Sequence, residues 1–195
     1  MLINDFICEA ILQPFPKPWE QKLITAGYRR VGIGRYAHVW AKRGDMFVVK
    51  VFQYDPAYAD FIELISQHQD NPHFPRTKGR LTRLDEVWQA IRIERLTRLA
   101  PNIWINQILE YRGAHNFILM PPRRDTLPSY IEEMNQFYKE FRQKYPPLAE
   151  ALDLIFTELC DTGQCGIDLA TRGNIRMRGN IPVITDPVFD RGLRT

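Results

Sequence analysis

Residues 28–52, YRRVGIGRYAHVWAKRGDMFVVKVF, constrain the fold more than any other stretch of the chain. Three short apolar runs are separated here by turn residues, at positions 32–37 and 43–45. Short runs rich in β-branched and aromatic residues and bounded by glycine are typical of strands, and glycine supplies the positive φ that tight turns need. The stretch therefore predicts three consecutive antiparallel strands. A later run, VWQAIRIE, predicts another strand.

The rest of the chain predicts mostly helices. Apolar residues recur at three- and four-residue spacing in YDPAYADFIELISQ, which predicts a helix from about residue 55 to a point before residue 72. The segments PSYIEEMNQFYKEFRQKYPP and PLAEALDLIFTELC carry similar stripes and predict two more helices. The segment IRMRGNIPVITD then predicts two short strands joined at residues 178–180. Strands followed by helices predict an α+β fold.

Composition excludes several classes of function. A chain of 195 residues with 45% hydrophobic residues can bury a core as one compact unit. The charge of +3, from 26 basic and 23 acidic residues, is too balanced to indicate a nucleic-acid partner. The three cysteines have no nearby histidine, which argues against zinc and favours a reducing compartment. No apolar run is long enough for a membrane span, and the first residues lack the lysines of an export signal. We therefore expect a cytoplasmic protein, or one secreted without a cleaved signal.

Residues 32–37, Gly-Ile-Gly-Arg-Tyr-Ala, have the form G-x-G-x-x-A. A Rossmann site needs this motif between a strand and a helix, whereas strands are predicted here on both sides. A glycine-rich turn between strands, followed by a lysine in an apolar strand, suits a flap over nucleotide phosphates. In this interpretation the bare backbone at Gly32 and Gly34 approaches the phosphates, Tyr36 lies at the tip, and Val39 covers the adenine.

Lys50, in VVKVF, would then reach the phosphates as a point charge. The alternative is a lysine that extends its charge into solvent from a sheet edge. A lysine that turns inward needs a counter-charge, because an unpaired buried ammonium is costly. The predicted helix offers Asp60 and Glu63. Glu63 is the better candidate because its side chain is longer.

The segment DLATRGNIRMRGNIPVITD places Asp168, Asn174 and Asp186 around the predicted hairpin. Phosphoryl transfer needs an acid that orients the acceptor hydroxyl, and oxygen ligands that hold magnesium on the phosphates. One aspartate and one asparagine are a sufficient protein contribution to Mg²⁺. Taken singly, each residue is better explained as a turn or loop residue. Taken together, behind a glycine turn and a lysine, the three indicate a phosphoryl-transfer site.

The order GIGRYA, VVK, DLATRGN and ITDPV resembles the protein kinase-like superfamily over residues 28–188. Within it the chain looks most like two groups of minimal kinases, the early protein kinase of short-tailed coliphages and the HopBF-type bacterial effector kinases. This resemblance implies a two-lobed fold. Residues 1–97 would form a small lobe with an N-terminal extension, the glycine flap, one helix and the hinge strand. Residues 98–195 would form a reduced helical lobe.

The same resemblance implies roles for individual residues. Lys50 matches the phosphate-binding lysine and Asp168 the catalytic aspartate, while Asn174 and Asp186 match the metal ligands. The segment VWQAIRIERL resembles the strand that leads to the hinge, which would place residues 93–96, among them Ile93 and Glu94, beside the adenine. ATP and Mg²⁺, or Mn²⁺, are the cofactors that the family uses.

The implied activity is phosphorylation of a serine or threonine of a host protein. For the effector type that host protein is a eukaryotic heat-shock chaperone, which the kinase inactivates. The alternatives are a small-molecule phosphotransferase, a phage early kinase acting on bacterial host proteins, and an inactive nucleotide-binding module. Two departures from the family pattern bear on them: Gly166 and Ile167 replace the usual histidine and arginine, and DPV replaces D-F-G. We expect no regulation by an activation loop, because only nine residues follow Asp186.

Overall fold

The computed structural model describes residues 14–34, 36–98, 103–119, 128–159, 165–169, 171 and 173–194. Its helices are α1 (Lys17–Thr25), α2 (Pro56–Gln67), α3 (Ile103–Leu119), α4 (Pro128–Lys144) and α5 (Pro146–Leu154), with a π-helical turn (Ile155–Leu159) and a 3-10 turn (Arg191–Arg194). Its strands are β1 (Tyr28–Ile33), β2 (Ala37–Lys42), β3 (Phe47–Gln53), β4 (Thr77–Arg83), β5 (Trp88–Glu94), β6 (Thr97–Arg98), β7 (Cys165–Ile167), β8 (Ile175–Arg178), β9 (Ile181–Ile184) and β10 (Val188–Asp190). The architecture is mixed α+β, as the sequence predicts.

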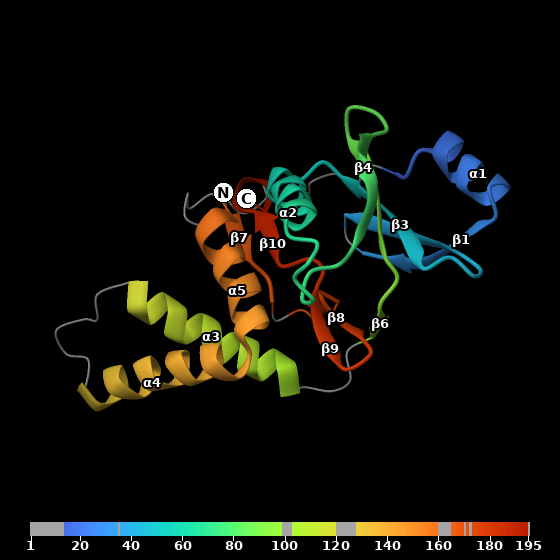
Figure 1. Ribbon diagram of the computed structural model, residues 1–195. Coiled ribbons are helices and arrows are strands. Elements are labelled where there is room, and N and C mark those ends of the chain that lie inside the picture. The colour runs from blue at the N-terminus through green and yellow to red at the C-terminus, as the bar shows by residue number, and fades with distance from the viewer. Residues whose placement is uncertain are drawn as a thin grey trace, which may run out of the picture.

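A five-stranded antiparallel sheet has the strand order β1-β2-β3-β5-β4. The three predicted consecutive strands are confirmed, and Gly44 in the second turn has a φ of 77°. One face of the sheet buries the aromatic cluster Phe15, Trp40 and Trp88 against side chains of α1, a helix that the sequence analysis did not predict. Figure 1 shows α1 at the far edge of the sheet, away from the other helices.

The other face of the sheet packs on α2, the helix predicted after the third strand. Asp55 caps its first turn by accepting a hydrogen bond from the backbone N–H of Tyr58. The apolar stripe of α2 joins Phe52 and Ile91 of the sheet in the main core. This stripe is almost fully buried, and its members are Tyr58, Phe61, Ile62 and Ile65. Burial of the stripe fixes which face of α2 meets the sheet.

Helices α3, α4 and α5 gather on one side of the molecule, with α2 between them and the sheet (Figure 1). Helices α4 and α5 were predicted, whereas α3 was not. Leu148, Leu152 and Ile155, from the predicted stripe of α5, are fully buried in the main core. Tyr111 of α3 is also fully buried, and its hydroxyl donates to Asp153 at 2.7 Å. In the described part of the chain, no helix is both long and apolar enough to cross a membrane.

The last part of the chain forms two small antiparallel sheets. Strands β8 and β9 are the predicted hairpin, whose turn contains Gly179 at a φ of 59°. Strand β6 pairs with the outer side of β8, and β7 pairs with β10. The turn between α2 and β4 holds the hairpin in place, because the N–H of Ile184 donates to the carbonyl of His73 at 2.9 Å. These pairings bring Asp168, Thr171, Asn174 and Asp186 under the inner face of the sheet.

Candidate functional site

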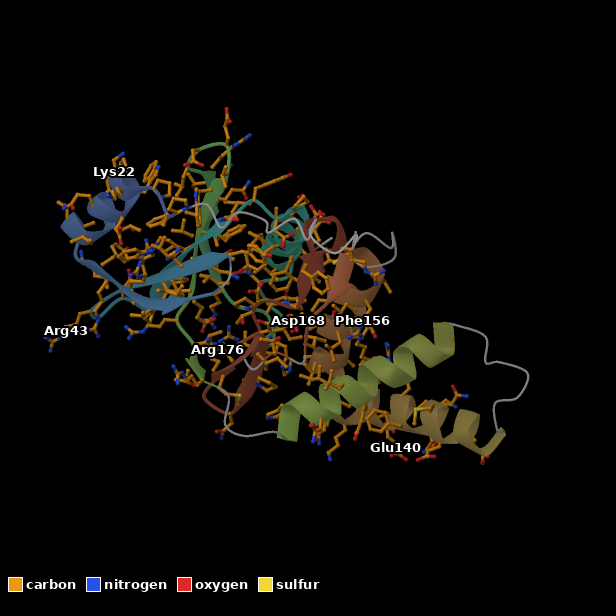
Figure 2. The ribbon with its side chains drawn as sticks, turned by 180° about the vertical axis from the view of Figure 1, so that it is seen from behind. Lys22, Arg43, Glu140, Phe156, Asp168 and Arg176 are labelled. Atoms are coloured by element: carbon orange, nitrogen blue, oxygen red, sulfur yellow. The ribbon has the colours of Figure 1, made fainter. Side chains whose placement is uncertain are left out.

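A cavity of about 840 Å³ lies between the sheet and the two small sheets below it. Its lining comes from β1, β2 and β3, from the end of β5 and the segment that follows it, and, near the end of the chain, from Asp168, Thr171, Gly173, Asn174 and residues 185, 186 and 188–190. Figure 2 shows Asp168 and Arg176 in this region, between the sheet and helices α3 to α5. Every predicted site residue except one lines the cavity: Gly32, Gly34, Tyr36, Val39, Lys50, Ile93, Glu94, Asp168, Asn174 and Asp186. The exception is Glu63.

The glycine turn covers one side of the cavity, and the N–H of Gly34 donates to the carbonyl of Ala37 at 2.7 Å. A Cβ added to Gly32 would come no nearer than 3.6 Å to Val39, and one added to Gly34 no nearer than 3.7 Å to the Ala37 carbonyl oxygen. Both are ordinary van der Waals distances, and neither residue has a positive φ. Packing within the chain therefore does not require glycine at either position. The bare backbone serves to leave room in the cavity.

Lys50 points into the cavity from β3, and its Nζ lies 2.9 Å from Oδ2 of Asp186. The lysine side chain is largely buried, whereas the aspartate is more than one third exposed. Burial is the largest single influence and lowers the pKa of Lys50, but Asp186 and Tyr58 together more than offset it, so the pKa is raised above its ordinary value. The ammonium is therefore charged at neutral pH. This contact also joins the sheet to the segment after β9.

The prediction that Glu63 or Asp60 pairs with Lys50 is wrong. Both carboxylates lie on the exposed face of α2. The apolar stripe of the helix must face the sheet, and this orientation turns positions 60 and 63 away from it. Tyr58 faces Lys50 instead.

Tyr58 supports the lysine with its ring, since Nζ lies 3.6 Å from the ring centroid. A cation at this distance from an aromatic face is attracted by the ring's electrons. The Tyr58 hydroxyl donates to the carbonyl of Thr185 at 3.4 Å, next to Asp186. Burial raises the pKa of Tyr58 to about 12, so the phenol stays neutral. The sequence analysis had taken Tyr58 only as a core residue, although it alone in that stripe carries a polar atom.

Ile93 and Glu94, predicted to lie beside an adenine, differ in how they line the cavity. Ile93 packs with Val39 and Val48 to form an apolar wall. The carboxylate of Glu94 is bound to the guanidinium of Arg178, with an Nε to Oε1 distance of 2.8 Å. Burial by itself raises the pKa of Glu94, but hydrogen bonds from Arg178 and from the N–H of Arg76 lower it below its ordinary value. The Glu94 side chain is thus a structural link rather than an available ligand.

Arg178 extends this link to the connection between α2 and β4. Its guanidinium donates to the carbonyl of Pro72 at 2.7 Å and to that of Phe74 at 3.0 Å. One side chain therefore holds together the hairpin β8–β9, the end of β5 and the turn after α2. The sequence analysis did not single it out, because its partners lie about 84 to 106 positions away in the chain.

Asp168 lies directly after β7, and hydrogen bonds from its backbone and from neighbouring residues hold it in place. Its N–H donates to the carbonyl of Pro187 at 2.7 Å, and the hydroxyl of Thr171 donates to its Oδ1 at 2.7 Å. The Asn174 amide nitrogen donates to the Asp168 carbonyl at 2.6 Å. Asn174 is buried, and its Oδ1 is the atom that remains for a cation. The loop is therefore closed on itself, with Asp168 and Asn174 both facing the cavity.

Gly166 contributes to how the segment before Asp168 is held. Strand β7 pairs with β10 so that Gly166 lies opposite Phe189. A Cβ on Gly166 would lie within 2.7 Å of three atoms of the Phe189 ring. The ring therefore fills the space that a side chain at position 166 would need. This contact tethers the segment before Asp168 to the segment after Asp186.

The donor set of the site fits a magnesium ion that also binds phosphate. Mg²⁺ is usually held by one or two carboxylates together with substrate phosphates and water. Asp186 and the Oδ1 of Asn174 are such donors. Among the described residues, no group of three or more histidine, cysteine, aspartate or glutamate side chains forms a metal site of its own. These donors therefore suit a metal ion that is bound jointly by the protein and a phosphate ligand better than a structural metal ion held by protein side chains alone.

A comparison of the sequence with models of protein families found no match, and a search among curated proteins found none either.

Proposed function

We propose that this chain is an ATP-dependent protein kinase with a kinase-like arrangement of two lobes, which phosphorylates serine or threonine of a protein. One observation carries the proposal. Lys50, Asp186 and the pair Asp168 and Asn174 come from three separate segments and line one cavity under a glycine turn. Each residue type alone is common, but together they supply the charges and oxygen ligands that phosphoryl transfer requires.

The proposed roles follow from the contacts. Lys50 is charged and held between Asp186 and the Tyr58 ring, so it binds the phosphates of ATP as a fixed positive charge. The wall of Val39, Val48 and Ile93 packs against the adenine. The backbone of the glycine turn lies over the phosphates.

Asp168 orients the acceptor hydroxyl toward the γ-phosphate. Thr171 fixes the carboxylate through its hydrogen bond to Oδ1, and the backbone bond to Pro187 fixes the loop. Asn174 and Asp186 would hold Mg²⁺ or Mn²⁺, which neutralises charge on the phosphates when it is bound. Since such chemistry consists mainly of positioning, a site held by these short contacts is suited to it.

A protein acceptor is favoured by the rim of the cavity. Val31, Ile33 and Tyr54 line it and are 49%, 67% and 52% exposed. Apolar side chains that gather around a cavity mouth indicate a surface that another macromolecule covers. A eukaryotic heat-shock chaperone is the first substrate to test, and that choice rests on the family resemblance alone.

The proposal is tested by incubating the purified protein with γ-labelled ATP, Mg²⁺ and lysates of eukaryotic and bacterial cells. We expect the wild-type protein to label a discrete protein band, which mass spectrometry then identifies. Asp168→Ala should abolish labelling and retain Mg²⁺-dependent ATP binding, whereas Asp186→Ala should lose both. Asp190→Asn serves as a matched control, because Asp190 also lines the cavity but has no proposed catalytic role.

Three outcomes contradict the proposal in different ways. ATP hydrolysis or small-molecule labelling without protein labelling indicates a small-molecule phosphotransferase. ATP binding without turnover indicates an inactive nucleotide-binding module. Full labelling by both Asp168→Ala and Asp186→Ala removes the kinase assignment altogether.

A further inference from the structure

We propose that Arg98 and Arg176 form an anion-binding subsite in the cavity, which receives a phosphate or carboxylate group of the acceptor protein. The inference rests on the proposed kinase function and adds a substrate class to it: acceptors that carry an acidic or phosphorylated residue near the target hydroxyl. Nothing in the kinase assignment requires two arginines here.

The two arginines lie directly opposite each other. Strand β6 pairs with β8 so that Arg98 is the register partner of Arg176, and both side chains line the cavity. Like charges at directly opposed positions of an antiparallel pair repel each other and destabilise it. Local conflicts of this kind are expected where function needs them. The pair therefore calls for an explanation other than sheet stability.

Neither guanidinium is neutralised by a carboxylate within the part of the chain that the structure describes. In contrast, Lys50 is paired with Asp186 and Arg178 with Glu94. Burial, and then the charge of Arg98, lower the pKa of Arg176. An oxyanion between the two guanidinium groups would offset both the burial and the repulsion.

Negative charge collects elsewhere in the cavity. The carboxylates of Asp186 and Asp190 both act on Asp55 and raise its pKa, after burial as the main cause. All three line the part of the cavity near α2 and β10. The arginines instead belong to β6 and β8, which are separate from the elements that carry these three carboxylates. An anionic ligand is therefore directed to the arginine side.

Arg176 is also held in a fixed orientation close to the catalytic loop. Its Nε donates to the carbonyl of Gly173 at 3.2 Å, and Gly173 is the neighbour of Asn174. This bond leaves the two terminal nitrogens for a ligand. A guanidinium presents parallel N–H groups that match the two oxygens of a phosphate or carboxylate. Arg176 and Asp168 both line the cavity and are labelled in Figure 2, so the subsite shares the cavity with the position proposed for the acceptor hydroxyl.

The experiment follows the Nε–H signals of the arginines in ¹⁵N-labelled full-length protein by NMR. Inorganic phosphate, phosphoserine and serine are titrated separately, with and without a saturating nonhydrolysable ATP analogue and Mg²⁺. We expect phosphate and phosphoserine, but not serine, to shift the Arg176 signal saturably, and the shift to persist with the analogue bound. Arg98→Gln and Arg176→Gln should each weaken this binding about tenfold or more.

The matched control is Arg43→Gln, which removes the same charge from the turn between β2 and β3, at the outer edge of the molecule in Figure 2. It should change phosphate affinity less than about twofold, because an exposed charge at that distance is screened by salt. Thermal melting of each variant confirms that it is folded.

Three results overturn the inference. The first is the absence of any saturable shift in the wild-type protein. The second is binding that survives both arginine substitutions but disappears in Lys50→Met, because phosphate then binds at the lysine. The third is displacement of phosphate by the ATP analogue, which assigns the arginines to the nucleotide. Binding of the analogue itself is measured in the same samples, so failure of the kinase proposal is recognised separately.

Discussion

Substitution of Gly166 by alanine tests how the segment that carries Asp168 is held. The added Cβ would lie 2.6 Å from Cε2 and 2.7 Å from Cε1 of Phe189, and closer still to Cζ. Real Cβ atoms do not approach ring carbons so closely, so either the ring or the strand must move. The ring cannot retreat freely, because β7 and β10 are paired and the N–H of Asp168 is bonded to the Pro187 carbonyl. We therefore expect loss of stability together with displacement of Asp168.

The size of the effect follows from overpacking. Forcing an extra methyl group into a packed interior costs about 1–3 kcal/mol. For a chain of 195 residues each kcal/mol lowers the melting temperature by about 2–4 °C. Gly166→Ala should therefore melt about 2–12 °C lower than the wild-type protein. Phosphate transfer at a temperature where the variant is folded should also fall, because Asp168 is linked to the displaced strand.

A double-mutant cycle isolates the contact. Phe189→Leu removes the planar ring and leaves a smaller side chain, so Gly166→Ala should cost less in this background. The double variant should be more stable, by about 1 kcal/mol or more, than the sum of the two single effects predicts. Thermal unfolding followed by circular dichroism measures all four proteins.

Gly113→Ala is the matched control for this cycle. Gly113 is exposed in α3, and a Cβ there would meet nothing within 4 Å. Because alanine is the better helix former, this variant should be more stable by up to about 1 kcal/mol. The reasoning is refuted if Gly166→Ala melts at the wild-type temperature, or if its cost is unchanged by Phe189→Leu.

Substitutions at four further positions have definite expected results. Lys50→Met should lower turnover by about 10²- to 10³-fold and leave the protein folded, as steady-state kinetics and melting would show; unchanged turnover would mean that the lysine binds no phosphate. Tyr58→Leu should weaken ATP binding by about 2- to 30-fold, whereas Tyr58→Phe keeps the ring under Lys50 and should bind nearly normally, measured by calorimetry; equal effects would exclude the cation–π contact. Arg178→Lys should cost about 2–3 kcal/mol in urea unfolding, since a lysine cannot keep the bonds to Glu94 and to two carbonyls; a silent variant would show that the link is dispensable. Asp55→Asn keeps the helix cap and should raise the melting temperature at pH 7 but not at about pH 3. Burial raises the pKa of Asp55 in the folded protein, so ionisation of the carboxylate lowers the stability of the fold above that pKa and has no effect below the ordinary pKa of an aspartate. An equal gain in melting temperature at both pH values would refute this assignment.

Local sequence pattern by itself determined much of the fold. The three strands before Tyr54, the helix α2 and the hairpin β8–β9 follow from apolar periodicity and from glycine at the turns, which act within a few residues. The same holds for α4 and α5. Helix α3 was missed because its apolar residues are spread around the helix, and strands β6, β7 and β10 because they are two or three residues long. Such short strands exist only through their partners.

The candidate site divides in the same way. Residue type and chain order were enough to single out Lys50, Asp168, Asn174 and Asp186 as candidates for phosphoryl transfer, and the structure places all four along one cavity. Only the tertiary structure decided which groups contact one another. A shift of one residue along a helix rotates a side chain by about 100°, so sequence alone did not distinguish the faces of α2. In the orientation that α2 adopts, Glu63 is exposed to solvent and the Tyr58 ring contacts Lys50.

Pairing between strands that are distant in the chain decided the other contacts around the cavity. The register of β7 with β10 set a phenylalanine ring against Gly166, and the register of β6 with β8 set Arg98 against Arg176. Each pair joins residues that no local pattern connects, since their separations in the chain are far longer than any turn or helix repeat. The free energy that selects these registers comes from burial of the whole core, to which all parts of the chain contribute. For this reason the sequence was enough to name candidate residues for the site, whereas the contacts between them required the tertiary structure.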